Sequence, residues 1–220
     1  MPTVNVTLRF TGRYIAHPYW PEMEKLINIQ KESGFNRTRS AERRAKTLEA
    51  YLESKGMTTE QYKLLETQAA RPFYTWRDVW VDGATRVKRD ETEIVVPAHH
   101  LYGCLAQAAD IAPSAVRPVR TDQIRTILTV SDFSTGKLKA DGVFERFVTV
   151  KSGTGQTLSN QRSFRSNPYI EAFDASGTLR CANPETLPKV REFVAWAGRE
   201  VGVGASRKLG YGRFTIAKWE

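Results

Sequence analysis

Hydrophobic and polar residues alternate from residue 3 to residue 10, and this pattern predicts a strand with one buried face. Successive side chains of a strand point to opposite sides. The buried side therefore carries Val4, Val6, Leu8 and Phe10, and the polar residues between them face solvent.

Six further segments have the composition or alternation of strands. They are FYTWRDVWV (73–81), TEIVVPA (92–98), IRTILTVSDF (124–133), VFERFVTVK (143–151), YIEAFD (169–174) and RFTIAKW (213–219). We expect segments 124–133 and 143–151 to pair with each other. We expect 169–174 to turn through ASG into TLRC.

Apolar residues at helical spacing predict four helices. The first follows Ser40, and the second follows Thr58, which forms a capping-box pattern with Gln61. The third covers 98–110, and the fourth begins near Asn183 and Pro184, an N-cap residue followed by proline. Their apolar faces carry Ala41, Ala45, Leu48 and Leu52; Tyr62, Leu65 and Ala69; Leu101, Cys104, Leu105 and Ala108; and Leu187, Val190, Val194 and Ala197.

The order of these elements predicts the fold class. Without residues 12–90, the order is strand, helix, two or more strands, helix, strand, which is the order of a ferredoxin-like domain. Such a domain is an α+β fold, an antiparallel sheet with two helices on one face. We expect a single domain over 1–220, in which 12–90 is a largely helical insertion.

The chain is basic, with 33 lysines and arginines against 24 acidic residues and a formal net charge of +9. Such a balance favours a polyanionic partner, although a merely basic soluble protein has the same composition. Cys104 and Cys181 lie in apolar segments, which indicates buried thiols and a reducing compartment. The sequence has neither a secretory signal pattern nor an apolar run of membrane-spanning length, so we expect a cytoplasmic protein without a membrane partner.

Metal and nucleotide-cofactor motifs are absent from the sequence. There is no C-x-x-C, no H-E-x-x-H and no phosphate-loop pattern, and GVGASR lacks the third glycine of the dinucleotide fingerprint. Adjacent His99 and His100 would point about 100° apart on a helix and would not easily share one ion. We therefore expect neither a metal nor a cofactor.

Three histidines are the weak catalytic candidates. His17 lies beside a proline in a predicted loop, where an imidazole can serve as a general base. His99 and His100 lie at a predicted helix start, where free N–H groups attract phosphate. The alternative for His17 is a loop histidine without a chemical role, and the alternative for His99 and His100 is helix capping or packing.

Basic and aromatic residues alternate with small polar ones between residues 151 and 169. Lys151, Arg162 and Arg165 would contact phosphates there, and Phe164 would stack on a base. Alternatively, Phe164 anchors this loop to the core.

A glycine-rich segment, EVGVGASRKLGYGRF, runs from residue 200 to residue 214 between the last helix and the last strand. Arg207 and Lys208 lie between its second and third glycines. This arrangement would let an anion approach the backbone N–H groups directly. The alternative is a helix C-cap followed by a tight turn, which would require fewer glycines.

Two of these segments carry a family resemblance. VGVGASRKLGYGRF resembles the C-terminal glycine-rich loop of the repeat-associated mysterious protein (RAMP) superfamily of CRISPR-associated proteins. IVVPAHHLYGCL (94–105) is similar to the strand-proline-helix segment of that superfamily. The two motifs cover about 26 residues, and the predicted strand order extends the likeness to the core.

The resemblance implies an RRM-related core that binds CRISPR RNA, most like the backbone subunits that polymerise along the guide. The insertion and a projecting hairpin, with a flexible loop at 151–168, would be the palm-and-thumb elements. Ala98, His99 and His100 would face the RNA backbone. The glycine loop would be lined by Gly204, Arg207, Lys208, Gly210 and Gly212.

The chain departs from the family at its first strand, which is followed by RFTGRYIAHPYW rather than a glycine-rich segment. No aspartate matches the cleavage residue of the target-cleaving subgroup. We therefore expect a non-catalytic, RNA-binding backbone-type subunit of a CRISPR effector complex. Its partners would be guide RNA, target nucleic acid, other subunits and copies of itself.

Two alternatives remain open from the sequence. The first is a metal-independent, guide-processing endoribonuclease of the same superfamily, in which a histidine activates the RNA 2′-hydroxyl. The second is a basic scaffold protein that binds only proteins.

Overall fold

The computed structural model describes residues 2–16, 21–34, 40–71, 73–75, 92–118, 123–152 and 159–220. The chain divides into two compact units, one formed by Met1–His17 with Phe73–Glu220 and the other by Pro18–Pro72. The second unit lies within the segment that the sequence predicts as an insertion.

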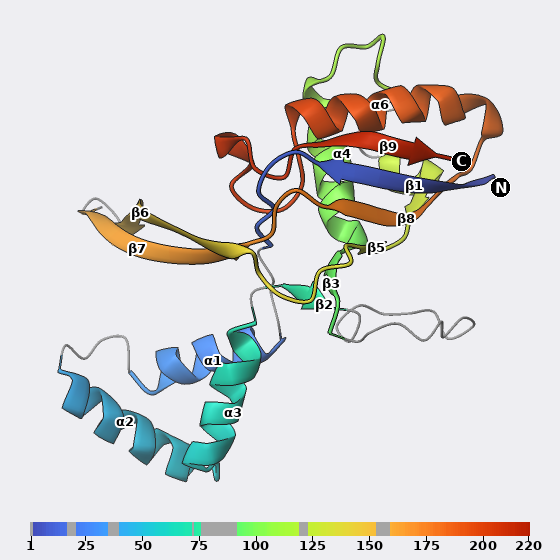
Figure 1. Cartoon of the computed structure of the whole chain (residues 1–220). Coiled ribbons are helices and arrows are strands. Elements are labelled where there is room, and N and C mark those ends of the chain that lie inside the picture. Colours follow the sequence, from blue (N-terminus) through green and yellow to red (C-terminus); the bar gives the residue numbers. More distant parts are fainter. Residues whose placement is uncertain are drawn as a thin grey trace. The chain divides into compact units, whose positions relative to one another are not determined.

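The larger unit is built around a mainly antiparallel sheet, with strand order β2-β3-β5-β8-β1-β9 and with β4 paired to β8. Strands β9, β1, β8 and β4 lie in the order of a ferredoxin-like sheet, so the predicted α+β fold class is confirmed. Figure 1 shows β9, β1 and β8 side by side. The strands are β1 (Thr3–Phe10), β2 (Tyr74–Thr75), β3 (Ile94–Val96), β4 (Leu128–Val130), β5 (Phe133–Ser134), β8 (Asp174–Cys181) and β9 (Phe214–Trp219).

One face of this sheet is buried. The alternation predicted for β1 is confirmed, because Val4, Val6, Leu8 and Phe10 are buried and the residues between them are at least partly exposed. They share a core with helices α4 (Ala98–Ile111) and α6 (Leu187–Glu200). Helix α4 contributes the predicted Leu101, Cys104, Leu105 and Ala108, and α6 contributes Val190, Val194 and Ala197.

The start of α6 follows the predicted cap. The Asn183 side chain accepts a hydrogen bond from the N–H of Glu185, and a short 3₁₀ helix (Pro184–Thr186) leads into α6. Leu187 is half-buried rather than buried.

Strands β6 (Gly142–Ser152) and β7 (Ser159–Tyr169) form a separate two-stranded antiparallel sheet, the predicted β-hairpin. The predicted pairing of segment 124–133 with 143–151 is therefore wrong. Residues 124–127 form helix α5 (Ile124–Ile127), and β4 pairs with β8 instead. This pairing places Leu128 in the core opposite Cys181, whereas β6 finds all its backbone partners on β7.

The predicted turn at ASG is also wrong, because this tripeptide lies inside the continuous strand β8. A Cβ atom on Gly177 would lie 2.9 Å from the Phe133 ring. Here glycine makes room for a neighbouring strand's side chain, which sequence alone does not show.

The smaller unit contains helices α1 (Pro21–Glu32), α2 (Ala41–Ser54) and α3 (Thr59–Ala69). The predicted capping box of α3 is confirmed, with Thr58 and Gln61 bonded reciprocally. The apolar core is small, since its buried cluster consists of Ile29, Leu52 and Tyr62.

The predicted buried face of α2 is only partly correct. Leu52 is buried and Leu48 half-buried, but Ala41 and Ala45 are exposed, because the small core reaches only the C-terminal half of this helix.

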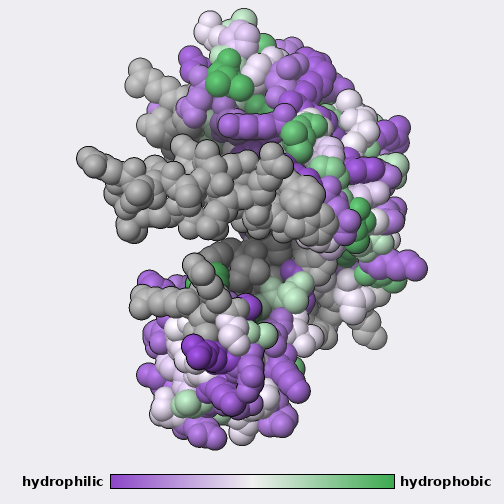
Figure 2. All heavy atoms as spheres, turned by 90° about the vertical axis from the view of Figure 1, so that its left-hand side faces the viewer, coloured by the Kyte–Doolittle hydropathy of each residue, from purple (hydrophilic) through white to green (hydrophobic). Residues whose placement is uncertain are grey.

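Figure 2 shows mainly hydrophilic residues on one face of this helical unit, which is the lower part of Figure 1. Among the described residues, no helix is long and apolar enough to cross a membrane.

Candidate nucleic-acid interface

The glycine-rich segment after α6 is held by backbone hydrogen bonds to the chain that follows β1. The N–H of Ala205 donates to the Ile15 carbonyl at 2.7 Å, and the N–H of Gly212 donates to the Arg13 carbonyl at 2.7 Å. Within the segment, the N–H of Val203 donates to the Gly212 carbonyl at 2.9 Å. The loop is therefore a fixed part of the core unit.

The four glycines of this loop are explained by the protein's own backbone. All have positive φ: +76° at Gly202, +78° at Gly204, +81° at Gly210 and +70° at Gly212. Added Cβ atoms would lie 2.8 Å from the Tyr211 carbonyl oxygen at Gly202, 2.5 Å from that of Ile15 at Gly204 and 1.8 Å from that of Val203 at Gly212. These four glycines therefore do not require an approaching ligand, contrary to the prediction from the sequence.

A pocket of about 780 Å³ opens beside this loop. The predicted residues Gly204, Arg207 and Lys208 line it. Gly210 and Gly212 are not among its lining residues, and Gly212 is buried. The remaining lining residues are Gln107, Arg146, Asn167, Glu200, Val201, Ala205, Ser206, Leu209 and Arg213.

The lining of this pocket is strongly basic. Arg146, Arg207, Lys208 and Arg213 contribute four cations, and Glu200 contributes the one carboxylate among the described lining residues. Lys208 is exposed and Arg207 half-buried. Because cations outnumber the carboxylate and the surface is concave, the pocket has a positive electrostatic potential that attracts an anion.

Arg146 links the hairpin to the glycine-rich loop. Its Nη2 donates to the Ser206 hydroxyl oxygen at 3.1 Å. Its Nε is buried and has no hydrogen-bond partner among the described residues. A buried donor without a partner is costly, and the same side chain also lines the pocket.

The backbone at Ser206 adds further donors. Ser206 adopts a left-handed conformation with φ of 60°, and the short 3₁₀ helix Arg207–Leu209 follows it. Within the described part of the chain, the backbone N–H groups of Ser206, Arg207 and Lys208 find no acceptor. Successive free N–H groups beside a left-handed residue favour anion binding.

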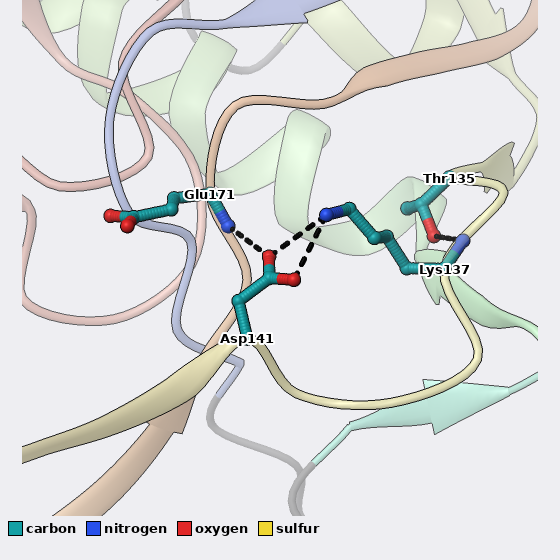
Figure 3. Close-up of polar contacts among 4 residues, drawn as sticks. All are labelled: Thr135, Lys137, Asp141 and Glu171. Carbon is teal, nitrogen blue, oxygen red and sulfur yellow. Dashed lines mark hydrogen bonds and ion pairs between the residues drawn. The ribbon is translucent and has the colours of Figure 1, made fainter.

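Asp141 fixes the root of the hairpin. Its carboxylate accepts hydrogen bonds from Lys137 Nζ at 2.9 and 3.0 Å and from the backbone N–H of Glu171 at 2.9 Å (Figure 3). The hydrogen bond from the Glu171 N–H is the main cause that lowers the pKa of Asp141 below its ordinary value, and the hydrogen bond from Lys137 lowers it further. Since Asp141 precedes β6 and Glu171 follows β7, this carboxylate joins both ends of the hairpin.

A second contact at the hairpin root involves Arg13. The Arg13 guanidinium lies 4.3 Å from the centroid of the Tyr169 ring, and its Nε donates to the Glu171 carboxylate at 3.3 Å. In Figure 3 the Glu171 side chain points away from Asp141. These contacts fix the strands that carry Arg146 and Asn167.

The N-terminus of α4, which was predicted to contact phosphate, already has a carboxylate bound to its first N–H group. The N–H of Ala98 already donates to the Asp132 carboxylate at 2.7 Å. A phosphate at this helix end would have to lie beside that negative charge. Ala98, His99 and His100 are also absent from the described lining of the basic pocket.

The two adjacent histidines have different surroundings. His99 is exposed, and desolvation lowers its pKa, although the charge of Asp132 opposes this shift. His100 Nδ1 lies 2.8 Å from the hydroxyl of Tyr14, a buried tyrosine. The two imidazoles also contact the Tyr74 ring edge-on, at centroid distances of 5.2 and 5.6 Å.

Other predicted site residues are only partly described. His17 lies outside the described residues. Lys151, Arg162, Phe164 and Arg165 lie on β6 and β7, where only the backbone pairing is described, including Arg165 opposite Arg146. Their contacts with RNA therefore remain predictions.

Both cysteine thiols are buried, as predicted. Burial raises the pKa of Cys104 to about 12, so this thiol stays protonated at neutral pH. Among the described residues, no group of three or more His, Cys, Asp or Glu side chains is placed to hold a metal ion.

Nine of the twelve described residues that line the pocket were not predicted from the sequence. Six of the nine lie in the glycine-rich segment 200–214, whereas Gln107, Arg146 and Asn167 come from α4, β6 and β7, and the fold alone brings these three to the pocket. The net charge of +9 was a signal for a basic surface, but not for its position.

Comparisons with known proteins give only remote structural matches. No protein-family model matches the sequence, and no curated protein matches it. Among 51 matching chains of solved structures, one belongs to "Cryo-EM structure of the Type III-B Cmr-beta bound to cognate target RNA". It has 9% identity and a TM-score of 0.46, and covers 99% of this chain and 59% of the matched chain.

A second match is to "Crystal structure of Cmr6 from Pyrococcus furiosus", with 13% identity and a TM-score of 0.34 over 99% of this chain and 98% of the other. The present chain thus spans about three fifths of the first matched chain. Alignments with these scores carry no argument about the activity or partners of this chain.

Proposed function

We propose that this chain is an RNA-binding, backbone-type subunit of a cytoplasmic CRISPR ribonucleoprotein effector complex. The observation that carries the proposal is the basic pocket between the glycine-rich loop and the hairpin. Arg146, Arg207, Lys208 and Arg213 surround it, and the guide RNA phosphates would bind there.

The donors in this pocket suit a phosphodiester backbone. Arginine and lysine side chains with free backbone N–H groups are the usual partners of phosphate oxygens. The guanidinium group of Arg146, which lines the pocket, adds a charged donor for a phosphate oxygen. Such contacts hold the strand without reading its bases.

Two features support guide RNA and neighbouring subunits as the partners. The sequence resemblance at 94–105 and 201–214 is to proteins that bind CRISPR RNA, and the ferredoxin-like strand order agrees with that superfamily. A hairpin whose root is fixed by Asp141 offers a rigid arm for contacting RNA or another copy.

The number of copies bound per RNA tests the proposal. Purified protein would be mixed with unstructured RNAs of increasing length, and native mass spectrometry would count the bound copies. A backbone-type subunit gives a copy number that rises stepwise with RNA length, while the RNA stays intact. A constant single copy, or no binding at low salt, would refute the proposal.

A guide-processing endoribonuclease is the second candidate, and the exposure of His99 at the start of α4 favours it. An exposed imidazole is accessible to the 2′-hydroxyl of a bound RNA and can act there as a general base. Incubation of a CRISPR-repeat hairpin RNA without metal would test this activity. A single cut that His99→Ala abolishes, with RNA binding retained, would favour the enzyme over the backbone subunit.

A further inference from the structure

Glu200 is an unexpected residue in a pocket that binds phosphate. It is the last residue of α6 and lines the basic pocket together with Arg207 and Lys208. A carboxylate there repels the phosphates that the neighbouring cations attract. A side chain that opposes the main ligand of its pocket is expected to have a second role.

Glu200 also gains little from the fold. A negative charge at a helix C-terminus is unfavourable, because the free carbonyl groups carry partial negative charge. The side chain is exposed, and among the described residues it forms neither an ion pair nor a hydrogen bond. Local stability therefore gives no reason for a glutamate at this position.

We infer that Glu200 selects RNA over DNA by accepting a hydrogen bond from a ribose 2′-hydroxyl. This inference rests on the proposed function, because it assumes a nucleic-acid strand in the pocket. An ionised carboxylate only accepts hydrogen bonds, so its partner on the strand must be a donor. The donor next to a bound phosphate is the 2′-hydroxyl, whereas base amino groups lie farther from the backbone.

The same carboxylate would act against DNA. A deoxyribose offers no hydrogen at the 2′ position, so Glu200 would then add only its repulsion of the phosphates. Specificity gained from such a penalty on the wrong ligand is common. The 2′-hydroxyl is also the group by which proteins distinguish RNA from DNA.

Oligo(U) and oligo(dU) of equal length test the inference, because they differ only in the sugar. Their affinities for the full chain would be compared by fluorescence anisotropy, with 2′-fluoro oligo(U) as a third ligand. The 2′-fluoro strand keeps an RNA-like sugar but lacks the donor. Glu192→Ala is the matched control, since Glu192 is exposed on the same helix, about 12 Å along it from Glu200, and does not line the pocket.

We expect the parent to prefer oligo(U) over both other strands. Glu200→Ala should reduce this preference about tenfold, the size of a hydrogen bond to a charged group, mainly by tightening binding of oligo(dU) and the 2′-fluoro strand. Glu200→Gln keeps an acceptor oxygen without the charge and should keep part of the preference. Glu192→Ala should leave the preference unchanged.

Two results would overturn the inference and leave RNA binding intact. In the first, Glu200→Ala increases the affinity for all three strands by the same factor, which would mean that Glu200 only repels phosphate. In the second, the parent does not distinguish oligo(U) from the 2′-fluoro strand. If none of the strands binds, the proposed function itself fails.

Discussion

Replacing single glycines of the loop by alanine tests why they are glycines. Gly210 and Gly212 form a matched pair, because both have positive φ but only one is crowded. A Cβ atom at Gly210 meets nothing within 4 Å, whereas at Gly212 it would lie 1.8 Å from the Val203 carbonyl oxygen. Real Cβ atoms essentially never approach closer than 3.0 Å, so at Gly212 the backbone must move.

The two expected destabilisations differ accordingly. Gly210→Ala introduces only the left-handed strain of a non-glycine residue, about 1 kcal/mol. Gly212→Ala adds the displacement of the Val203 carbonyl and strains two hydrogen bonds, from Gly212 to Arg13 and from Val203 to Gly212. At about 1 kcal/mol for each bond, the total is about 3 kcal/mol.

Thermal unfolding followed by circular dichroism measures this difference. In a chain of this length, 1 kcal/mol lowers Tm by about 2–4 °C, so Gly212→Ala should lower Tm on the order of 10 °C. Hydrogen-exchange mass spectrometry on peptides covering 201–213 would assign the loss to the loop. Equal effects of the two substitutions would refute the view that backbone packing requires glycine at 212.

Two further predictions concern the hairpin root and the helical unit. Since Glu171 and Lys137 lower the pKa of folded Asp141, its charged form stabilises the protein above the unfolded pKa of about 3.9. Asp141→Asn should therefore destabilise the protein at pH 7. That difference should shrink as the pH falls through the folded pKa, and a pH-independent difference in urea unfolding would contradict the reasoning. Thr58→Ala removes the capping box of α3 and should cost about 1 kcal/mol. Thr67→Ala, on the exposed face of the same helix, should be nearly neutral. Hydrogen exchange of the first turn of α3 measures both, and equal exchange in the two variants would argue against the cap.

Local sequence patterns correctly predicted the elements that depend on residues close together in the sequence. The alternation in β1 reflects one buried sheet face, and the Thr58 cap depends only on residues within one helical turn. The fold class followed from the order of the elements along the chain, because few folds have this order.

Contacts between distant segments were not predictable in the same way. The pairing of β4 with β8 and the packing of Phe133 over Gly177 join residues more than 40 positions apart. The loop glycines gave a misleading signal, because Gly204 and Gly212 make room for Ile15 and Val203 rather than for a ligand. No sequence pattern marks such neighbours in advance.

The residues of the candidate site also divide into those that local sequence patterns predicted and those that only the fold brings together. Arg207 and Lys208 were identified beside the glycines, and both line the pocket. Arg146 lies 60 residues before Ser206, its hydrogen-bond partner, and in sequence it is one cation among 33. In the structure, its place in the pocket lining and its hydrogen bond to Ser206 distinguish it.

The central claim is that Arg207 and Lys208 bind RNA phosphates in this pocket. The most direct measurement is the salt dependence of affinity for a labelled, unstructured RNA, with Arg207→Ala/Lys208→Ala compared with the parent. The control Lys189→Ala/Arg191→Ala removes the same charge from exposed positions of α6 outside the pocket lining.

On a single strand, each phosphate contact contributes about 0.7 to the slope of log affinity against log salt. The loop variant should therefore flatten the slope by about 1.4, and the α6 variant should keep the parent slope. Equal slopes for the parent and the loop variant, or equal flattening in both variants, would contradict the account, since the pocket would then not be the phosphate site.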